Sequence, residues 1–330
     1  MLVTGGAGFI GSHVAEHLLR LDHDVVVLDD LSGGSTGNVP SGAAFVRGDV
    51  CDASLIDRLF AEHRFDVVYH LAAYAAEGLS HFIRRFNYTN NLVGSVTLLN
   101  AAINTGARRF VFTSSIAVYG SNQLPMTEDL VPRPEDPYGI AKLAFEQDLA
   151  AAARVFGIEY VVFRPHNVYG ERQNIADPYR NVVAIFMRCA LEHQALPIFG
   201  DGSQTRAFSY IGDVAPIIAR GGFEPGAANQ IFNVGADQPV SVLRLAEAVG
   251  RVFERPREIA FHPARHEVQH AFSSHAKVTA VFGRQPATGF EDGLARMAAW
   301  VRTAGIGTRQ KFESIEIQRS LPPIWAALAD

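Results

Sequence analysis

The sequence predicts an α/β protein, with a doubly wound parallel sheet and a smaller, interleaved α/β lobe. Three observations support this fold class. Short apolar runs alternate with helical patterns through the first half of the chain. Those runs are continuous, which is typical of parallel strands covered by helices on both faces. The first run ends in glycines that lead directly into a helical pattern.

Strands and helices alternate in order along the first half. The helix predicted at 137–157 is the clearest, because proline stands at its start and glycine at its end. The other predicted helices lie at 11–23, 54–63 and 90–106. The predicted strands lie at 1–4, 24–30, 43–50, 65–73, 109–115 and 158–165.

After residue 167 the predicted strands and helices no longer alternate regularly. We expect helices at 179–193, 212–223, 238–253 and 289–305, with strands and turns at 196–211. Residues 1–167 are therefore predicted to form a nucleotide-binding domain, to which a segment near 208–235 returns. Residues 168–330 would form mainly a substrate lobe and a tail. The tail at 308–330 contains Trp325, so we expect it to pack either on the body or on a partner subunit.

Composition excludes several classes of function. The chain has 330 residues, with 48% hydrophobic and 19% charged, as in an ordinary globular protein. The net charge is −5 and the basic residues do not cluster, so we expect no nucleic-acid partner. Cys51 and Cys189 suggest neither a disulfide framework nor a metal site. No run is long enough to span a bilayer and no secretory leader is recognisable, so we expect no membrane partner and a cytoplasmic location.

The glycine turn predicts a dinucleotide site of the Rossmann type. Gly5, Gly8 and Gly11 would allow a tight turn, close approach to a pyrophosphate, and close packing of helix on strand. Phe9 and Ile10 open the helix whose N–H groups face the anion. Asp29 ends the second strand, where a carboxylate binds ribose hydroxyls and disfavours a 2′-phosphate, so NAD is the predicted cofactor. The alternative is a plain turn with a solvated acid.

Further cofactor contacts are expected at the ends of the neighbouring strands. Asp30 and the "GDV" stretch would lie beside the adenosine, and the "HLAA" stretch would lie near the pyrophosphate. A loop aspartate and a small-residue packing site are the respective alternatives. The residues concerned are Asp30, Asp49, Val50, Leu71, Ala72 and Ala73.

The stretch "TSSIAVYG" at 113–120 predicts a catalytic site at the end of a strand. Tyr138 and Lys142 are spaced i, i+4, so a helix places both side chains on one face. An ammonium beside a phenol favours the phenolate, which can act as a general base near neutral pH. Ser115 would reach the same substrate hydroxyl. A tyrosine–lysine pair on a helix surface is the alternative, and the nearby glycine turn argues against it.

These motifs together carry a resemblance. "TGGAGFIGSH", "HLAA", "TSSIAVYG", "YGIAK" and "FRPHNVYG" resemble those of the extended short-chain dehydrogenase/reductase superfamily, within it the NAD-dependent nucleotide-sugar epimerases and dehydratases. The resemblance implies that Ser115 and Tyr138 are catalytic and that Lys142 contacts the nicotinamide ribose. It implies that Asn91 supports the active-site region.

The same resemblance implies further contacts with cofactor and substrate. Pro165 and His166 would pass the nicotinamide, and the sugar diphosphate would meet a set of residues in the second half. Two arginines suit a diphosphate because guanidinium groups bind its oxygens in forked pairs. The implied substrate residues are Ser115, Asn167, Asn181, Pro197, Phe199, Arg206 and Arg265.

Departures from the family pattern indicate the subclass. Ile116 and Ala117 stand where the dehydratases carry an acid pair, so dehydration is not expected. A lysine that 4-epimerases often carry near Ala75 is missing, which leaves the diphosphate contact there in doubt. The leading interpretation is 4-epimerisation of a UDP-hexose, either UDP-glucose/UDP-galactose or an N-acetyl or uronic acid form, through a 4-keto intermediate.

Two alternatives remain open. One is a nucleotide-sugar reductase or dehydrogenase, which would exchange NAD(P) where an epimerase retains it. The other is a non-catalytic NAD-sensing regulator, which would lose the tyrosine or the lysine. The resemblance also implies a homodimer, because related chains pair through the helices after Asn90 and after Pro137.

Overall fold

The computed structural model describes residues 1–330 except 180, 255–257, 265–267, 308–314, 323–324 and 326–330. It contains a seven-stranded sheet with the order β11-β6-β5-β4-β1-β2-β3, in which every pair of neighbours is parallel. The strands are β1 (Leu2–Thr4), β2 (Val26–Asp29), β3 (Ala44–Arg47), β4 (Val67–His70), β5 (Arg109–Thr113), β6 (Glu159–Pro165) and β11 (Gln230–Val234).

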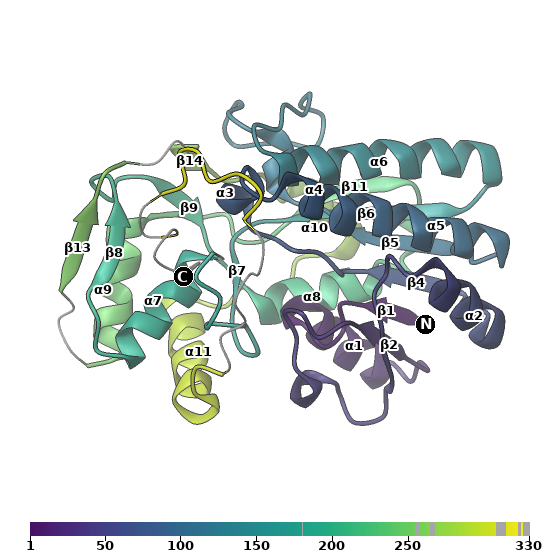
Figure 1. The fold of residues 1–330 in the computed structure, drawn as a ribbon, viewed down its shortest axis with the longest axis horizontal. Helices are drawn as coiled ribbons and strands as arrows, with labels where there is room; N and C mark the ends of the chain where they lie inside the picture. The colour runs from purple at the N-terminus through teal and green to yellow at the C-terminus, as the bar shows by residue number, and fades with distance from the viewer. Residues whose placement is uncertain (180, 255–257, 265–267, 308–314, 323–324, 326–330) are drawn as a thin grey trace.

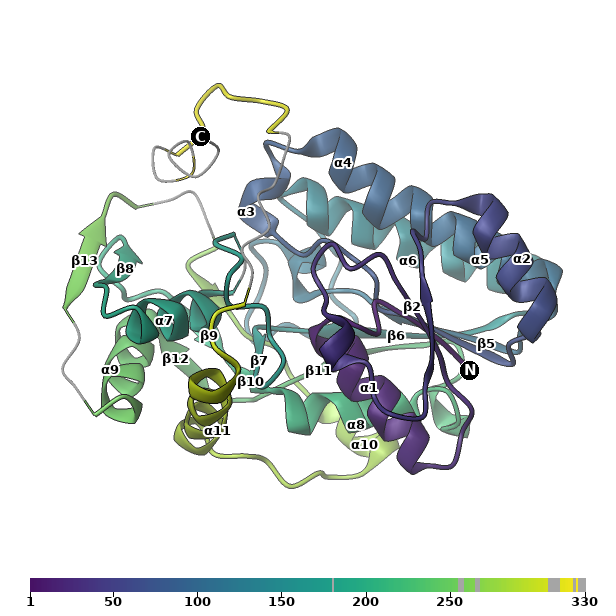
Figure 2. The same cartoon turned by 60° about the horizontal axis from the view of Figure 1, so that its bottom comes forward.

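Helices cover both faces of this sheet, and Figures 1 and 2 show the two layers. On one face α1 packs against α8, and on the other α5 packs against α2 and α6. Successive strand residues join different cores: Leu2 belongs to one hydrophobic cluster and Val3 to the other. The helices are α1 (Phe9–Arg20), α2 (Ala53–His63), α5 (Gly94–Asn104), α6 (Pro137–Phe156), α8 (Ile211–Arg220) and α10 (Ala276–Phe282). The predicted doubly wound α/β fold is confirmed.

Helix α6 begins and ends where its end signals predict. Asp136 caps its first turn by accepting a hydrogen bond from the Gly139 N–H at 2.9 Å, and Pro137 stands at the first position. Gly157 ends it in the left-handed conformation, with φ of 75°. This fixed start determines where the second residue, Tyr138, lies.

The substrate lobe lies beyond the carboxyl ends of the strands (Figure 1). Two small sheets, β8 with β13 and β9 with β12 and β14, pack with the helices α7, α9 and α11. The elements are β7 (Val168–Tyr169), α7 (Val182–Leu191), β8 (Leu196–Phe199), β9 (Thr205–Ala207), β10 (Ser209–Tyr210), β12 (Pro239–Ser241), α9 (Val242–Val252), β13 (Ile259–His262), β14 (His270–Ala271) and α11 (Phe290–Ala304).

The two lobes are interleaved along the chain. The first elements of the substrate lobe are α7, β8 and β9. The chain then returns to the large sheet through α8 and β11, and β11 pairs with β6 at the edge of that sheet. The domain boundary after residue 167 remains a prediction. Among the residues that the structure describes, no helix is long and apolar enough to cross a membrane.

Some local predictions differ from the structure. The helix predicted over 238–253 begins only at Val242, because 239–241 pairs with β9 as an antiparallel strand and Ser241 caps the helix. The helix predicted at 90–106 starts with a π turn over Thr89–Val93. Two short helices, α3 (Glu77–Ser80) and α4 (Arg84–Tyr88), were not predicted, since neither is long enough to show a helical period.

We expect the sheet to lose stability in mild acid because of His70. The fully buried ring lies between Thr4 Oγ1 at 2.7 Å and Ser95 Oγ at 2.8 Å, and burial lowers its pKa to about 3. An unfolded histidine titrates near 6.5, so below that pH only the unfolded state takes up the proton. The free energy of unfolding should therefore fall by up to about 1.4 kcal/mol per pH unit as the pH falls through that window.

Urea unfolding between about pH 7 and about pH 5.5 measures this slope, above the range where most carboxylates titrate. His70→Asn should lower the slope by up to about 1.4 kcal/mol per pH unit, because asparagine does not titrate, whereas the contribution of the buried His166 remains. An unchanged slope in the variant would show that His70 is not the group responsible.

Candidate active site

A cavity of about 560 Å³ lies at the carboxyl ends of the strands, between the sheet and the substrate lobe. Residues from both lobes line it, which is the usual position of a ligand in this kind of fold. Most of the residues predicted for cofactor, substrate and catalysis lie along this one cavity. They are Gly5, Gly8, Phe9, Ile10, Gly11, Asp29, Asp30, Asp49, Val50, Leu71, Ala72, Ala73, Ser115, Tyr138, Lys142, Pro165, Asn167, Asn181, Pro197, Phe199 and Arg206.

The glycine turn is too tight for side chains. Gly5 has φ of +67°, and a Cβ there would lie 2.7 Å from the Ala72 backbone N. A Cβ at Gly11 would lie 2.1 Å from the Gly5 carbonyl oxygen. No side chain caps α1 at Gly8, so its first N–H groups can bind an anion. This cradle fits the pyrophosphate of a dinucleotide.

The carboxylate of Asp29 is held at the cavity by the backbone. It accepts hydrogen bonds from the Ala7 N–H at 3.0 Å and the Leu31 N–H at 2.8 Å. The side chain is buried, and this burial raises the pKa of Asp29. Its two oxygens retain acceptor capacity for hydroxyl groups, which fits a ribose.

The loop that follows Asp29 belongs to the site although its residues were not predicted there. Ser32, Gly33 and Gly34 also line the cavity, and a Cβ at Gly34 would lie 2.7 Å from the Ala7 carbonyl carbon. The loop therefore packs directly against the glycine turn. The signal was the pair of glycines in "LSGGSTG", which indicates close approach of two backbones.

We expect Asp29→Asn to lower the affinity for NAD by about tenfold and to narrow the preference for NAD over NADP. The amide keeps the shape but removes the charge that repels a 2′-phosphate, and a hydrogen bond to a charged group contributes about 1.5–3 kcal/mol. Calorimetry of the cofactor-free protein with NAD and with NADP measures both effects. Asp22→Asn is the control, because that carboxylate lies on an exposed loop. Equal affinities for NAD in the variant and the wild type would contradict the assignment of Asp29.

The three predicted catalytic residues all line the cavity. Ser115 follows β5, and its hydroxyl accepts a hydrogen bond from the Ala117 N–H at 3.1 Å. Tyr138 is 6% exposed and lies on the first turn of α6. One turn later the Lys142 ammonium lies 5.8 Å from the centre of the Tyr138 ring. The i, i+4 spacing has therefore placed both side chains on the face of α6 that lines the cavity.

Lys142 is held in place by surroundings that are mostly apolar. Its Nζ donates to the Thr113 carbonyl at 2.9 Å and lies 4.7 Å from the centre of the Phe112 ring. Burial lowers the pKa of Lys142 to about 7, although the charge of Glu146 acts in the opposite direction. The Thr113 hydroxyl lines the cavity and, within the described part of the chain, has no hydrogen-bond partner, so it can receive one from a ligand.

Asn91 lies behind the cavity. Its Oδ1 accepts from the Tyr74 N–H at 2.9 Å, and its Nδ2 donates to the Asn87 Oδ1 at 2.8 Å. Asn87 in turn donates to the Pro137 carbonyl at 2.8 Å. Asn91 thus connects the loop after β4 to the start of α6, next to Tyr138. This position is compatible with the supporting role that the resemblance implies.

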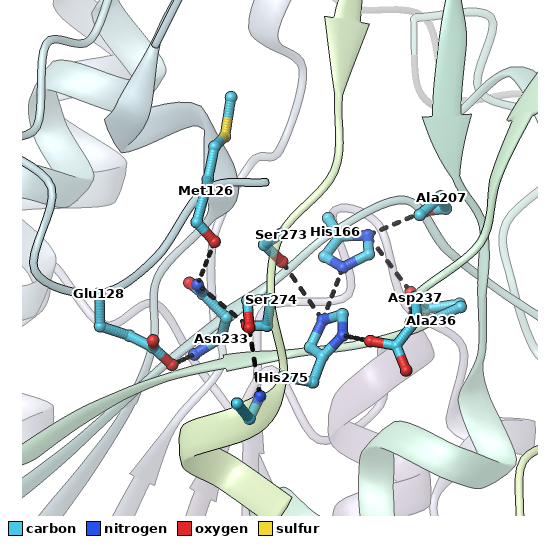
Figure 3. Close-up of polar contacts among 12 residues, drawn as sticks. Met126, Glu128, His166, Ala207, Asn233, Ala236, Asp237, Ser273, Ser274 and His275 are labelled. Carbon is cyan, nitrogen blue, oxygen red and sulfur yellow. Dashed lines mark hydrogen bonds and ion pairs between the residues drawn. The ribbon is translucent and has the colours of Figure 1, made fainter. Parts of the chain in front are cut away.

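His166 is not among the residues that line the cavity, although Pro165 and Asn167 are. Figure 3 shows its ring between the Ala207 carbonyl, 2.8 Å from Nδ1, and the His275 ring, 2.9 Å from Nε2. His275 continues the chain to Asp237 at 2.6 Å. Burial lowers the pKa of His166 to about 3.

The protonation of this histidine pair follows from its partners. A carbonyl can only accept, so His166 donates through Nδ1 and must accept through Nε2. His275 therefore donates to His166, and it also faces a carboxylate with its other nitrogen. His166 follows β6 directly, and its bond to the Ala207 carbonyl connects the end of β6 to β9, the strand that carries Arg206.

The predicted substrate residues that line the cavity come mainly from the part of the chain that follows β6. Asn181 caps α7 by accepting from the Val183 N–H at 2.8 Å, and it donates to the Val168 carbonyl at 3.0 Å. The Arg206 guanidinium donates to the Val268 carbonyl at 2.6 Å, which fixes its direction. Pro197 and Phe199 stand on β8. Arg265 lies outside the described residues.

Comparison with known proteins agrees with this geometry. The model of the NAD dependent epimerase/dehydratase family matches residues 1–235. A UDP-glucose 4-epimerase of Mycolicibacterium smegmatis is 37% identical over 311 residues, which is 91% of this chain and 98% of the relative.

Two crystal structures are also closely similar. The UDP-glucose 4-epimerase of Thermotoga maritima with UDP-glucose has a TM-score of 0.86 and 34% identity, covering 92% of this chain and 98% of that one. The Thermus thermophilus UDP-glucose 4-epimerase in complex with NAD has a TM-score of 0.86 and 34% identity, covering 92% and 99%. The family expected from the sequence motifs is thereby confirmed. This chain belongs to the NAD dependent epimerase/dehydratase family.

Proposed function

We propose that this protein is an NAD-dependent nucleotide-sugar epimerase that inverts C4 of a UDP-hexose through a 4-keto intermediate. One observation carries the proposal. The glycine turn, the Ser115–Tyr138–Lys142 group and the substrate residues of the second lobe line one continuous cavity. A relative with 37% identity over nearly its whole length is a UDP-glucose 4-epimerase.

The proposed cofactor site is formed by the glycine turn and by the carboxyl ends of the neighbouring strands. Gly5, Gly8 and Gly11 would hold the pyrophosphate, and Asp29 the adenosine ribose. Asp49, Val50 and the 71–73 stretch line the cavity as well. Bound NAD supplies a hydride acceptor and donor for the substrate carbon.

Tyr138 is the proposed proton carrier at the substrate 4-hydroxyl. Lys142 favours its phenolate by charge, and Ser115 would hydrogen-bond the same oxygen. When the sugar is reduced again on its other face, Tyr138 returns the proton. Ile116 and Ala117 offer no acid at the two positions after the serine, so this group performs no elimination of water there.

The substrate is anchored through its nucleotide. Arg206 is proposed to bind the diphosphate together with Arg265, and Asn167 and Asn181 to bind it from the opposite side. Pro197 and Phe199 would lie against the base. An anchor at the diphosphate leaves the hexose free to rotate, which inversion at C4 requires.

Interconversion of UDP-glucose and UDP-galactose without added cofactor tests the function. The N-acetyl and uronic acid forms are assayed beside them. Interconversion with protein-bound NAD and without net formation of NADH supports an epimerase, whereas formation of one NADH per oxidised sugar from added NAD would indicate a dehydrogenase. Failure to convert any of these sugars would refute the UDP-hexose proposal.

We also propose a homodimer in the cytoplasm. Val93 and Ile140 are 53% and 40% exposed, and they lie on neighbouring helical segments that pack together. Burial of these side chains against a second copy would remove exposed apolar surface. Light scattering at micromolar concentration should give twice the monomer mass, and Ile140→Glu should reduce it. A wild-type monomer would contradict the proposal.

Fractionation of cells tests the proposed cytoplasmic location.

A further inference from the structure

The C-terminal segment, defined by residues 315–322 and Trp325, folds back onto α3 and α4. The Glu316 and Ile317 N–H groups both donate to the Phe82 carbonyl, at 2.8 and 3.1 Å. The Glu316 carboxylate accepts from the Arg85 and Phe86 N–H groups at 2.8 Å, which caps α4. The segment is thus bound to the body through its backbone and through a charged cap.

Trp325 is the residue of this segment that reaches the cavity. It is only 6% exposed, and its ring centre lies 6.0 Å from that of Phe82 and 5.6 Å from that of Tyr179. A Cβ at Gly78 would lie 3.0 Å from the indole. The indole therefore rests directly on the backbone of α3 and cannot retreat in that direction. Trp325, Tyr179 and Gly78 line the cavity side by side.

The helix α3, which carries Gly78, also contacts the helix that carries Tyr138. α3 packs against the start of α6, where the Tyr138 N–H donates to the Ser80 hydroxyl at 3.3 Å. Tyr179 precedes Asn181, one of the proposed diphosphate contacts. The indole thus contacts α3, the helix that packs against the start of α6, and Tyr179, which lies two residues before Asn181.

The closely similar structures leave a small share of this chain unmatched. They cover 92% of this chain, although nearly all of their own length is matched. The family model begins at residue 1, and the last helix ends at Ala304 of 330. The part of the chain that follows α11 therefore corresponds in length to the unmatched share.

We infer that Trp325 is a specificity-determining residue that forms a wall of the hexose subsite. This inference rests on the proposed function. An aromatic face packs well against the C–H surface of a sugar ring, and a ring seated on α3 leaves a fixed space for the sugar's substituents. The indole would favour the compact hexose over its bulkier 2-acetamido form.

Trp325→Ala should therefore raise KM for UDP-glucose about tenfold with little change in kcat, because the chemical group is intact. The ratio of kcat/KM for UDP-N-acetylglucosamine to that for UDP-glucose should rise by about tenfold as the wall recedes. Ile317→Ala is the matched control, since this residue is on the same segment, 39% exposed, and does not line the cavity. An unchanged ratio in Trp325→Ala would overturn the inference.

A binding experiment gives a readout that does not depend on turnover. The chain has two tryptophans, and Trp300 lies on α11, away from the cavity lining. In Trp300→Phe, added UDP-glucose should change the indole fluorescence, whereas in Trp325→Phe it should not. If calorimetry shows binding while the emission of Trp300→Phe stays constant, the inference fails and the proposed function stands. If wild type binds no UDP-sugar at all, both fail.

Discussion

Tyr138→Phe is expected to lower kcat by about a hundred- to ten-thousand-fold, the usual contribution of a positioned proton carrier. The phenol oxygen is the only group removed, and the ring continues to fill its buried position in the first turn of α6. Binding should therefore survive. Interconversion of UDP-glucose and UDP-galactose measures the rate, and calorimetry with UDP-glucose measures affinity.

Tyr119→Phe is a matched control for that experiment. Tyr119 is also buried, and its hydroxyl donates to Asn233 at 2.8 Å outside the cavity lining. Losing that hydrogen bond should lower stability by about 1 kcal/mol and leave turnover largely intact. If Tyr138→Phe turned over as fast as wild type, the tyrosine would be a packing residue, and another group would have to move the proton.

The parts of this site that the sequence predicts are those encoded locally. The Gly5–Gly11 turn follows directly from glycines at short spacing between a strand and a helix. Tyr138 and Lys142 share a face because a helix repeats every 3.6 residues. Strand order then brings Ser115 to the same edge, since the carboxyl ends of parallel strands meet there.

The parts that the sequence did not predict depend on contacts between distant residues. His166 and His275 are adjacent in space but separated by 109 positions, and nothing in the residues around either indicates the other. The sequence leaves two positions open for the tail, on the body or on a partner subunit, and Trp325 lies on α3 of its own chain. Its closeness to Gly78 has no local signal, because packing of a terminal segment is decided by the complete surface.

Lys142→Met is expected to lower kcat by about a hundredfold, since the phenol of Tyr138 then loses the charge that favours its ionised form. Affinity for NAD should fall as well, because the ammonium is the proposed contact with the nicotinamide ribose. Turnover and calorimetry measure the two effects. Lys277→Met is the matched control: that ammonium also lies over a ring, 5.1 Å from the centre of Phe232, but not at the cavity. Equal losses in both variants would contradict a specific role for Lys142.

Lys142→Met should leave the folded protein at least as stable as the wild type. A loss of turnover in this variant would therefore not result from unfolding. Burial lowers the pKa of Lys142 to about 7, whereas an unfolded lysine titrates near 10.4. Between these values only the unfolded state holds the proton, so the wild type should gain stability as the pH rises, by up to about 1.4 kcal/mol per unit. Lys142→Met should lack this gain, because methionine does not titrate and fits the apolar surroundings. Urea unfolding at about pH 7 and about pH 9 measures it. A parallel rise in wild type and variant would mean that Lys142 keeps its proton in the folded protein over this pH range and that another group causes the gain.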